Sequence, residues 1–270
     1  MSVWVASLNS GSNGNCYYIG NEHEAVLIDA GISCRETEAR MARLGLSMRK
    51  VSAIFISHEH SDHIRGLTVL AKKYNLPVYI TPPTLFRSGL QIDGQLLRTF
   101  SAEEAVSVGS LSVIPFSKIH DAAHPHSFTV TCGDLKVGVF TDLGVVCENL
   151  ISHFQQCHAA FLEANYDDDM LEQGRYPYHL KRRIRGGQGH LSNKQALALF
   201  ESYRPSFMSH LFLSHLSKDN NCPDLALNLF KSRAATTEVI VASRYEETAL
   251  YRITAAQTKL PPAKAQYVLF

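Results

Sequence analysis

The stretch of sequence that decides the fold of this chain is His58-Glu59-His60-Ser61-Asp62-His63. Four of its side chains can bind a metal, and it directly follows an apolar run over residues 51–57 that predicts a buried strand. Imidazole nitrogens suit zinc and iron, and carboxylate oxygens suit manganese, so this mixed set can hold a catalytic divalent cation. The two His one residue apart would point the same way from an extended loop, while Asp62 and His63 would reach a second cation. The spacing differs from the helical His-Glu-x-x-His of metalloproteases.

Length and composition favour one large domain with little net charge. The chain has 270 residues, 45% of them hydrophobic, which is enough for a sizeable core. No linker rich in Pro, Gly or Ser separates two halves, and the candidate metal ligands are spread from residue 58 to residue 215. We therefore expect a single domain over residues 1–270. The formal net charge of +1 means that a nucleic acid would have to be bound by a local basic patch.

The cysteines and the apolar segments bear on where the protein works. Six Cys residues show no Cys-x-x-Cys pair and no regular spacing, which favours reduced thiols and a cytoplasmic location. The N-terminus lacks a basic leader followed by an apolar stretch, so no signal peptide is expected. No window approaches about 18 apolar residues, so no membrane-spanning segment is expected.

Short apolar runs alternate with segments of helical spacing along the chain. Strands are predicted at residues 3–8, 16–20, 25–29, 53–57, 77–81, 111–117, 127–132, 135–140, 159–162, 207–213 and 239–242. Helices are predicted at residues 35–45, 64–74, 148–156, 193–203 and 223–232. Ser192 and Gln195 have the spacing of a capping box for one of them, and Gly133-Asp134 predicts a hairpin. This alternation predicts a layered α/β fold.

The motif His58-x-His60-x-Asp62-His63 resembles the signature of the metallo-β-lactamase fold superfamily of binuclear metallohydrolases. That superfamily's other motifs are matched, in order along the chain, by Asp29, His120, Asp142 and His215. Three further stretches, 11–19, 189–193 and 215–218, resemble its YycJ (WalJ)-like branch, which is related to ribonuclease Z-type nucleases. The resemblance implies an αββα sandwich, two mixed sheets flanked by helices, with the site at one edge of the sheets.

The same resemblance implies a ligand set for two divalent cations, with zinc or manganese expected and iron also compatible. One cation would be held by His58, His60 and His120. The other would be held by Asp62, His63 and His215, with Asp62 counted among the catalytic residues as well. Asp142 would bridge both, because a bridging carboxylate lets two cations approach to about 3.5–4 Å and share one hydroxide, the nucleophile.

Other histidines compete for two of these positions. His124 and His126 lie close to His120 in the sequence, and His210 lies close to His215. We favour His120 because His-Asp-Ala matches the branch, and we expect His210, inside an apolar strand, to be a hydrogen-bonded structural residue. Four more are expected at the surface, namely His23, His153, His158 and His179.

Two acids and one further His could support the metal ligands. Asp29 ends an apolar run, so it is either a turn residue or an acid that orients a metal-binding His. Glu163 ends a predicted strand, and Gly189-His190 opens a predicted helix. Glu163 and His190 resemble the pair of ribonuclease Z in which the His assists departure of the leaving oxygen. Leu191 stands where that enzyme has Ser, and a plain connection into the helix is the alternative.

A dense basic run precedes Gly186-Gly187 and consists of Lys181, Arg182, Arg183 and Arg185. Beside the candidate general acid, these cations could contact phosphates. A charge run is also typical of a solvated helix face, and that alternative stays open here.

These features predict a binuclear metal-dependent phosphodiesterase, and more specifically a nuclease that acts as an exonuclease on DNA. The first alternative is a small-molecule hydrolase of the same fold, acting on a thioester, a lactone or a cyclic phosphodiester. The second is a non-catalytic metal-binding regulatory module, against which the complete ligand set argues. The expected partner is therefore nucleic acid rather than a membrane, and the oligomeric state stays open.

Overall fold

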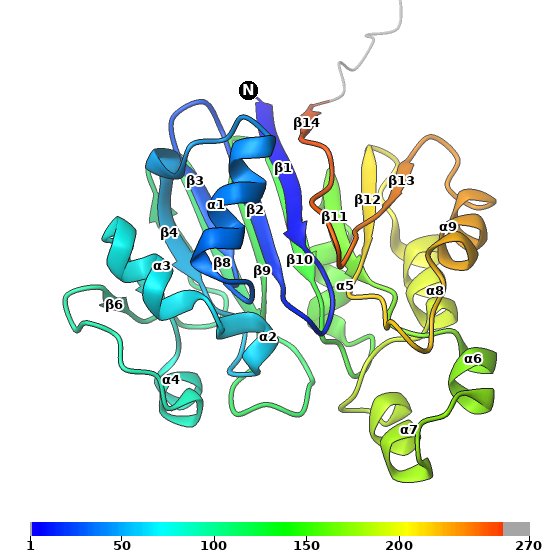
Figure 1. The fold of residues 1–270 in the computed structure, drawn as a ribbon. Coiled ribbons are helices and arrows are strands. Elements are labelled where there is room, and N and C mark those ends of the chain that lie inside the picture. The colour runs from blue at the N-terminus through cyan, green and yellow to red at the C-terminus, as the bar shows by residue number, and fades with distance from the viewer. Residues whose placement is uncertain (1, 256–270) are drawn as a thin grey trace, which may run out of the picture.

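The computed structural model describes residues 2–255 and shows two mixed β-sheets packed face to face (Figure 1). The first sheet has the strand order β14 (Tyr251–Thr254), β1 (Ser2–Asn9), β2 (Cys16–Gly20), β3 (Ala25–Ile28), β4 (Val51–Phe55), β5 (Val78–Tyr79) and β6 (Leu97–Arg98). The second has the order β13 (Glu238–Val241), β12 (His210–Ser214), β11 (Ala159–Glu163), β10 (Leu135–Phe140), β9 (His126–Cys132), β8 (Leu111–Ser117) and β7 (Val106–Val108).

The two sheets share one pairing pattern. In the first sheet β14, β1, β2 and β3 pair antiparallel, and β3, β4, β5 and β6 pair parallel. In the second sheet β13 to β10 pair parallel, and β10 to β7 pair antiparallel. The parallel strands of each sheet therefore bring several carboxyl ends to one edge.

The main core lies between the sheets and follows the two-residue period of a strand. In β3, Val26 and Ile28 belong to the core between the sheets, while the alternate residues face the outer helices. Aromatic rings meet across this layer, with centroids 4.9 Å apart for Tyr17 and Phe161. This packing fixes the two sheets against each other and so fixes the distance between the loops at their edges.

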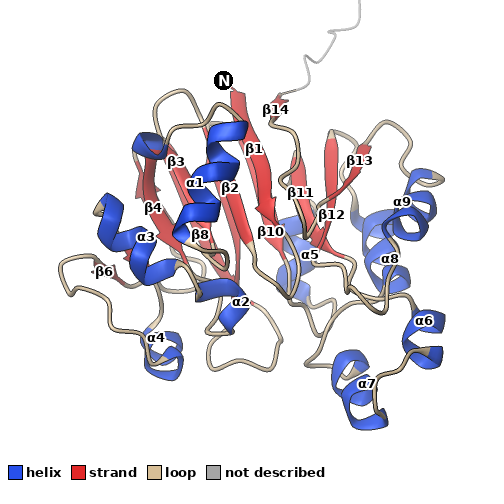
Figure 2. Cartoon of the chain, in the orientation of Figure 1, coloured by secondary structure: helices blue, strands red, loops and turns tan. Residues whose placement is uncertain are grey.

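Helices cover both outer faces, so the architecture is the expected αββα sandwich (Figure 2). The first sheet is covered by α1 (Cys34–Arg43) and α3 (Leu67–Tyr74). The second is covered by α5 (Glu148–Phe154), α8 (Asn193–Tyr203) and α9 (Pro223–Lys231). The capping box of α8 is present, because Ser192 Oγ accepts from Gln195 N and the Gln195 side chain accepts from Ser192 N.

Several short elements were not predicted from the sequence. They are η1 (Met48–Lys50), α4 (Pro82–Ser88), α6 (Asp168–Gln173), α7 (Tyr178–Arg185) and the edge strands β6, β7 and β14. The helix predicted over 64–74 begins only at Leu67, as α3, and Ile64 is the last residue of a separate short helix, α2 (Ser61–Ile64). The predicted strand over 207–213 begins only at His210, because Met208 N donates to Pro205 O at 3.0 Å in a turn.

The described part of the chain has no helix that is long and apolar enough to cross a membrane. The expected single domain over residues 1–270 includes residue 1 and residues 256–270, which lie outside the described residues.

Candidate metal centre

Six of the candidate residues lie at or just beyond the carboxyl ends of strands, at one edge of the two sheets. In chain order they follow or end β3, β4, β8, β10, β11 and β12, and they are Asp29, His58, His120, Asp142, Glu163 and His215. Loops at strand ends stay open to solvent while the sheets hold them still, which suits a binding site.

Three of these residues have a left-handed backbone that non-glycine residues seldom adopt. The φ angles are 62° at Asp29, 55° at Asp142 and 57° at His215. Such conformations are costly and persist only where the surroundings fix them, and they cluster at functional sites. Here each one turns a polar side chain inward directly after a buried strand.

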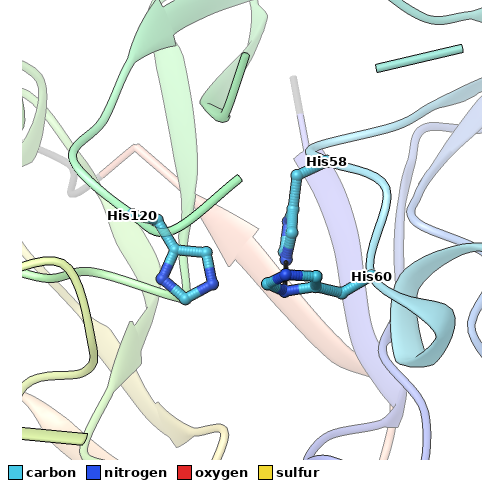
Figure 3. A group of neighbouring side chains, drawn as sticks. All are labelled: His58, His60 and His120. Atoms are coloured by element: carbon cyan, nitrogen blue, oxygen red, sulfur yellow. Dashed lines mark hydrogen bonds between the residues drawn. The ribbon is translucent and has the colours of Figure 1, made fainter. Parts of the chain in front are cut away.

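One group of potential ligands consists of His58, His60 and His120 (Figure 3). Their ring nitrogens lie within 4.8 Å of one another. His58 Nε2 and His60 Nδ1 are 3.0 Å apart, and the His120 ring faces both from the second sheet. Each sheet thus contributes to a common three-nitrogen cluster.

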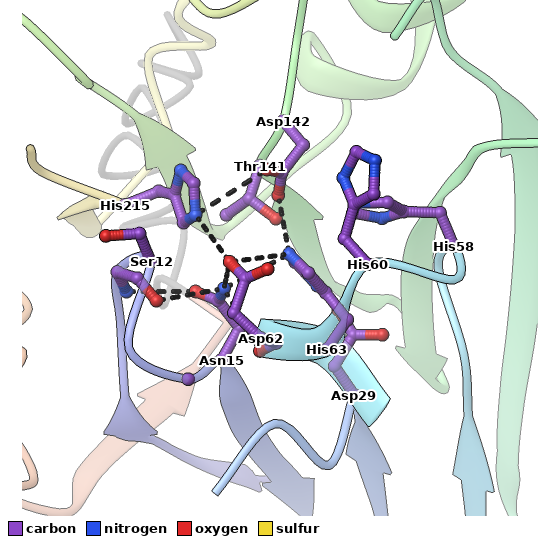
Figure 4. Close-up of polar contacts among 12 residues, drawn as sticks. Ser12, Asn15, Asp29, His58, His60, Asp62, His63, Thr141, Asp142 and His215 are labelled. Carbon is purple, nitrogen blue, oxygen red and sulfur yellow. Dashed lines mark hydrogen bonds and ion pairs between the residues drawn. The ribbon is translucent and has the colours of Figure 1, made fainter. Parts of the chain in front are cut away.

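A second group consists of Asp62, His63 and His215 (Figure 4). Asp62 Oδ2 lies 3.4 Å from His215 Nε2 and 3.5 Å from His63 Nε2. Asn15, from the loop between β1 and β2, donates to Asp62 Oδ2 at 3.2 Å. Again one His comes from the first sheet and one from the second.

Asp142 contacts members of both groups. Its carboxylate oxygens lie 3.2 Å from His63 Nε2, 3.5 Å from His215 Nε2 and 3.9 Å from His120 Nε2. The residue is buried, with 2% of its surface exposed. A carboxylate in this position can serve either group or both.

Two buried polar atoms at the centre make no well-aligned hydrogen bond, namely His120 Nε2 and Asp142 Oδ2, although Asp142 Oδ2 lies 3.2 Å from His63 Nε2. A buried polar atom without a partner costs about 1–3 kcal/mol. Bound cations would satisfy these atoms, because a ring nitrogen and a carboxylate oxygen are ordinary ligands of divalent metals. The residues therefore fit divalent metal ions.

Burial and charge set the protonation of the four buried rings. Burial lowers the pKa of His58 well below its ordinary value and lowers that of His120 to about 4, so both rings are neutral near pH 7. Burial also opposes the charge on His63 and His215, but nearby carboxylates, Asp142 foremost, outweigh it and raise both pKa values, that of His215 to about 10. A bound cation would displace those two protons, because a metal-binding ring nitrogen must be deprotonated.

Asp29 lies directly behind this cluster. Its carboxylate accepts from Ser57 N and Ser57 Oγ, both at 2.8 Å, and lies 2.7 Å from His63 Nδ1. With Nδ1 held by Asp29, the other nitrogen of His63 points at Asp62 and Asp142. Asp29 is thus placed to orient a ligand rather than to bind a metal itself.

Glu163 and His190 form a second supported pair. His190 Nδ1 lies 2.8 Å from Glu163 Oε1, and Glu163 Oε2 accepts from Leu143 N at 2.7 Å. Burial opposes ionisation of Glu163, but the charge of His190 and hydrogen bonds from His190 and His215 outweigh it and lower its pKa to about 2. His190 also lines, with both metal groups, a cavity of about 170 Å³.

Residues 10–180 match the model described as the metallo-beta-lactamase superfamily. The chain belongs to the metallo-beta-lactamase superfamily.

Two curated relatives align along most of this chain. It is 34% identical over 273 residues to the exodeoxyribonuclease YycJ of Bacillus anthracis, with 99% of this chain and 100% of that protein covered. It is 31% identical over 224 residues to the exodeoxyribonuclease WalJ of Streptococcus pneumoniae, with 81% and 83% covered. The crystal structure of YhfI from Bacillus subtilis, a metallo-beta-lactamase fold protein, has the same fold with a TM-score of 0.70, 17% identity and coverage of 93% and 100%.

The histidines that competed with His120 and His215 in the sequence lie outside both candidate metal groups. His126 is the first residue of β9, and its Nδ1 donates to His124 O at 2.9 Å. His210 Nδ1 contacts Ser209 Oγ at 2.8 Å, and its Nε2 lies 3.5 Å from Glu238. Neither His124, His126 nor His210 joins a described metal group.

The expectation that His153 lies at the surface is wrong. The residue is 7% exposed, and its ring stacks on Phe116 with centroids 4.1 Å apart. Glu103 supplies a partner for its Nε2 at 3.2 Å, which removes the cost of burying the polar nitrogen.

The basic run forms α7, which has no buried residue. Three of its cations already have partners: Arg183 reaches Asp121 Oδ2 at 2.6 Å, Arg185 reaches Glu172 at 2.7 Å, and Lys181 donates to the Glu172 carbonyl. The Arg182 guanidinium lies 6.0 Å from the Tyr178 ring. Arg183, with Leu180 and Ile184, lines the cavity at the metal centre.

Two residues at the centre were not singled out from the sequence. Lys118 is buried beneath the site and donates to Thr141 O at 2.7 Å, next to the strained Asp142. Asp121 Oδ1 lies 3.4 Å from His120 Nε2, while its other oxygen holds Arg183. Lys118 lies two residues before His120 and Asp121 directly after it, but a lone charge after a strand carries no distinctive pattern.

Proposed function

We propose that this chain is a metal-dependent nuclease that acts as an exonuclease on DNA. The observation that carries the proposal is the position of His190. Supported by Glu163, it lines the same cavity as both candidate metal groups. A general acid beside a metal centre is the arrangement that phosphodiester hydrolysis needs. The relatives named exodeoxyribonucleases, which align along most of the chain, support the same substrate class.

The proposed centre holds two cations, zinc or manganese. His58, His60 and His120 would hold one, and Asp62, His63 and His215 would hold the other, with Asp142 between them. When bound, the cations would supply positive charge for the oxygens of the scissile phosphate and make water more acidic. Asp29 would hold His63 in the orientation that presents Nε2.

His190 would move the proton that the leaving oxygen requires. Glu163 contacts its Nδ1, which leaves Nε2 as the nitrogen that can face a substrate in the cavity. Glu163 is buried and ionised, and its contact with Nδ1 holds the ring in place. Metal binding and proton transfer would thus be carried out by different residues.

DNA is favoured over a small molecule because the cavity is flanked by α7 and its basic side chains. We also infer that both sheets act as one domain over residues 1–270, since each sheet supplies ligands to each metal group. A cytoplasmic location agrees with the six free cysteines.

A substrate panel tests this proposal. Protein stripped with a chelator and reloaded with zinc or manganese would be incubated with end-labelled single- and double-stranded DNA and RNA. A thioester, a lactone and a cyclic phosphodiester would be offered in parallel. We expect release of mononucleotides from DNA. Turnover of one small ester with no cleavage of either nucleic acid would instead favour the small-molecule hydrolase.

A further inference from the structure

We propose that a second pocket, on the Ser12 side of the metal centre, binds a nucleotide of the DNA strand next to the one that is cut. The proposal rests on the nuclease function proposed above and adds a subsite to it. The pocket has a volume of about 330 Å³, within the usual range of about 300–1,000 Å³ for small-ligand pockets. Its polar lining includes Ser217, Lys218, Arg244 and Tyr245.

The pocket adjoins the metal centre through two short contacts. Ser10 lines the pocket, and its Oγ accepts from the backbone N of His215 at 2.8 Å. Arg244 Nη2 donates to Ser12 Oγ at 3.2 Å, and Ser12 lines the cavity of the metal centre. Figure 4 shows Ser12 beside Asp62 and Asn15. A strand lying across the metals could therefore reach the pocket with a neighbouring nucleotide.

The cations of this pocket differ from Arg183 and Arg185 of α7, which are held in ion pairs. Within residues 2–255, neither Lys218 nor Arg244 takes part in an ion pair, and Arg244 Nη1 is buried without a hydrogen-bond partner. The carboxylate of Glu246 also lines the pocket, so two cations outnumber one acid there. Side chains without a carboxylate partner can give charge-assisted hydrogen bonds to a phosphate oxygen.

Tyr245 adds a surface for a base. It directly follows Arg244 and lines the same pocket, yet 70% of its surface is exposed. An exposed aromatic ring beside unpaired cations is the combination that binds single-stranded nucleic acid, because bases stack on the ring and phosphates meet the cations. The pocket therefore fits one nucleotide, with its phosphate at Arg244 and Lys218 and its base at Tyr245.

Four variants test this subsite. Lys218→Ala and Arg244→Ala remove a cation, and Tyr245→Ala removes the ring, while Tyr245→Phe keeps it. Arg49→Ala is the charge-matched control, because Arg49 is exposed before β4, at the end of that strand remote from the metal centre. Fluorescence anisotropy with a single-stranded oligonucleotide in chelator gives binding without cleavage. Turnover of bis(p-nitrophenyl) phosphate by reloaded protein reports the metal centre alone.

We expect Arg244→Ala and Tyr245→Ala to weaken oligonucleotide binding at least about fivefold, with Tyr245→Phe and Arg49→Ala near wild type. The Lys218 side chain is exposed and makes no hydrogen bond or ion pair of its own in the described chain. Lys218→Ala should therefore reduce by about 1 the slope of the logarithm of the DNA-binding constant against the logarithm of the salt concentration. Turnover of bis(p-nitrophenyl) phosphate should be unchanged in all of these variants. Unchanged binding in the three pocket variants would overturn the subsite, as would a parallel loss of chromogenic turnover. If wild type binds DNA through these residues but never cuts it, the nuclease function fails and the subsite stands.

Discussion

His190 Nδ1 lies 2.8 Å from Glu163 Oε1, and the same oxygen lies 3.1 Å from His215 Nδ1. One buried carboxylate thus supports both the candidate general acid and a candidate metal ligand. Removing either His leaves the other supported, whereas changing Glu163 affects both.

We predict that His190→Ala leaves metal content intact but slows DNA cleavage about 10²–10⁴-fold, the usual contribution of a general acid. A p-nitrophenyl ester should lose much less, because its leaving group needs little protonation. Glu163→Gln should slow both substrates, since it also loosens His215. His23→Ala, at an exposed position between β2 and β3, is the control. Equal losses on both substrates for His190→Ala would mean that His190 serves the structure instead.

Asp29 is predicted to strengthen metal binding without touching the metal. Asp29→Asn keeps a residue type that tolerates the left-handed backbone at φ 62° but removes the charge that holds His63. Metal affinity, measured by competition with a chromophoric chelator, should fall about 10–100-fold. Asp134→Asn, in the exposed turn between β9 and β10, controls for the lost charge. Wild-type affinity in Asp29→Asn would leave Asp29 as a turn residue only.

Asp142 and His60 should differ in how many cations they affect. Asp142 lies between the two groups, so Asp142→Asn should reduce metal content at both positions, whereas His60→Ala should weaken mainly one. Elemental analysis of protein prepared without chelator measures this, with wild type expected to approach two equivalents. A variant Asp142→Asn that retains the wild-type metal content would remove the bridging assignment.

The cations of α7 should contribute unequally to DNA binding. Arg182 has no carboxylate partner in the described chain, so Arg182→Ala should flatten the salt dependence of DNA binding by about 1. Arg183→Ala should also change chromogenic turnover, because it frees Asp121 beside His120. If neither variant alters salt dependence or turnover, α7 is a solvated helix face.

The fold was largely predictable because its core strands carry strong local signals. Residues 25–28 and 159–162 are continuous apolar runs, each followed by an acid, and the structure places them in β3 and β11. By contrast, α7 is rich in charged residues and has no buried residue, and β7 and β14 are short edge strands with few buried residues. Elements that bury little leave little pattern in a sequence.

The sequence singled out the candidate ligands that the structure brings together, but few of the residues around them. His58 to His63 are clustered in the sequence, but the proximity of His120 and His215 depends on the packing of two sheets. The burial of His153 depends on Glu103, a partner 50 residues away, and the position of Lys118 depends on a carbonyl of another strand end. Such long-range contacts leave no local periodicity.

The proposed binuclear nuclease is tested most directly by measuring DNA cleavage during a metal titration. Chelator-stripped protein would receive zinc or manganese in steps while label release from end-labelled single-stranded DNA is measured. We predict no cleavage without metal and a plateau at two equivalents per chain. Cleavage by metal-free protein, a plateau at one equivalent, or no release of label with either metal would contradict a binuclear nuclease.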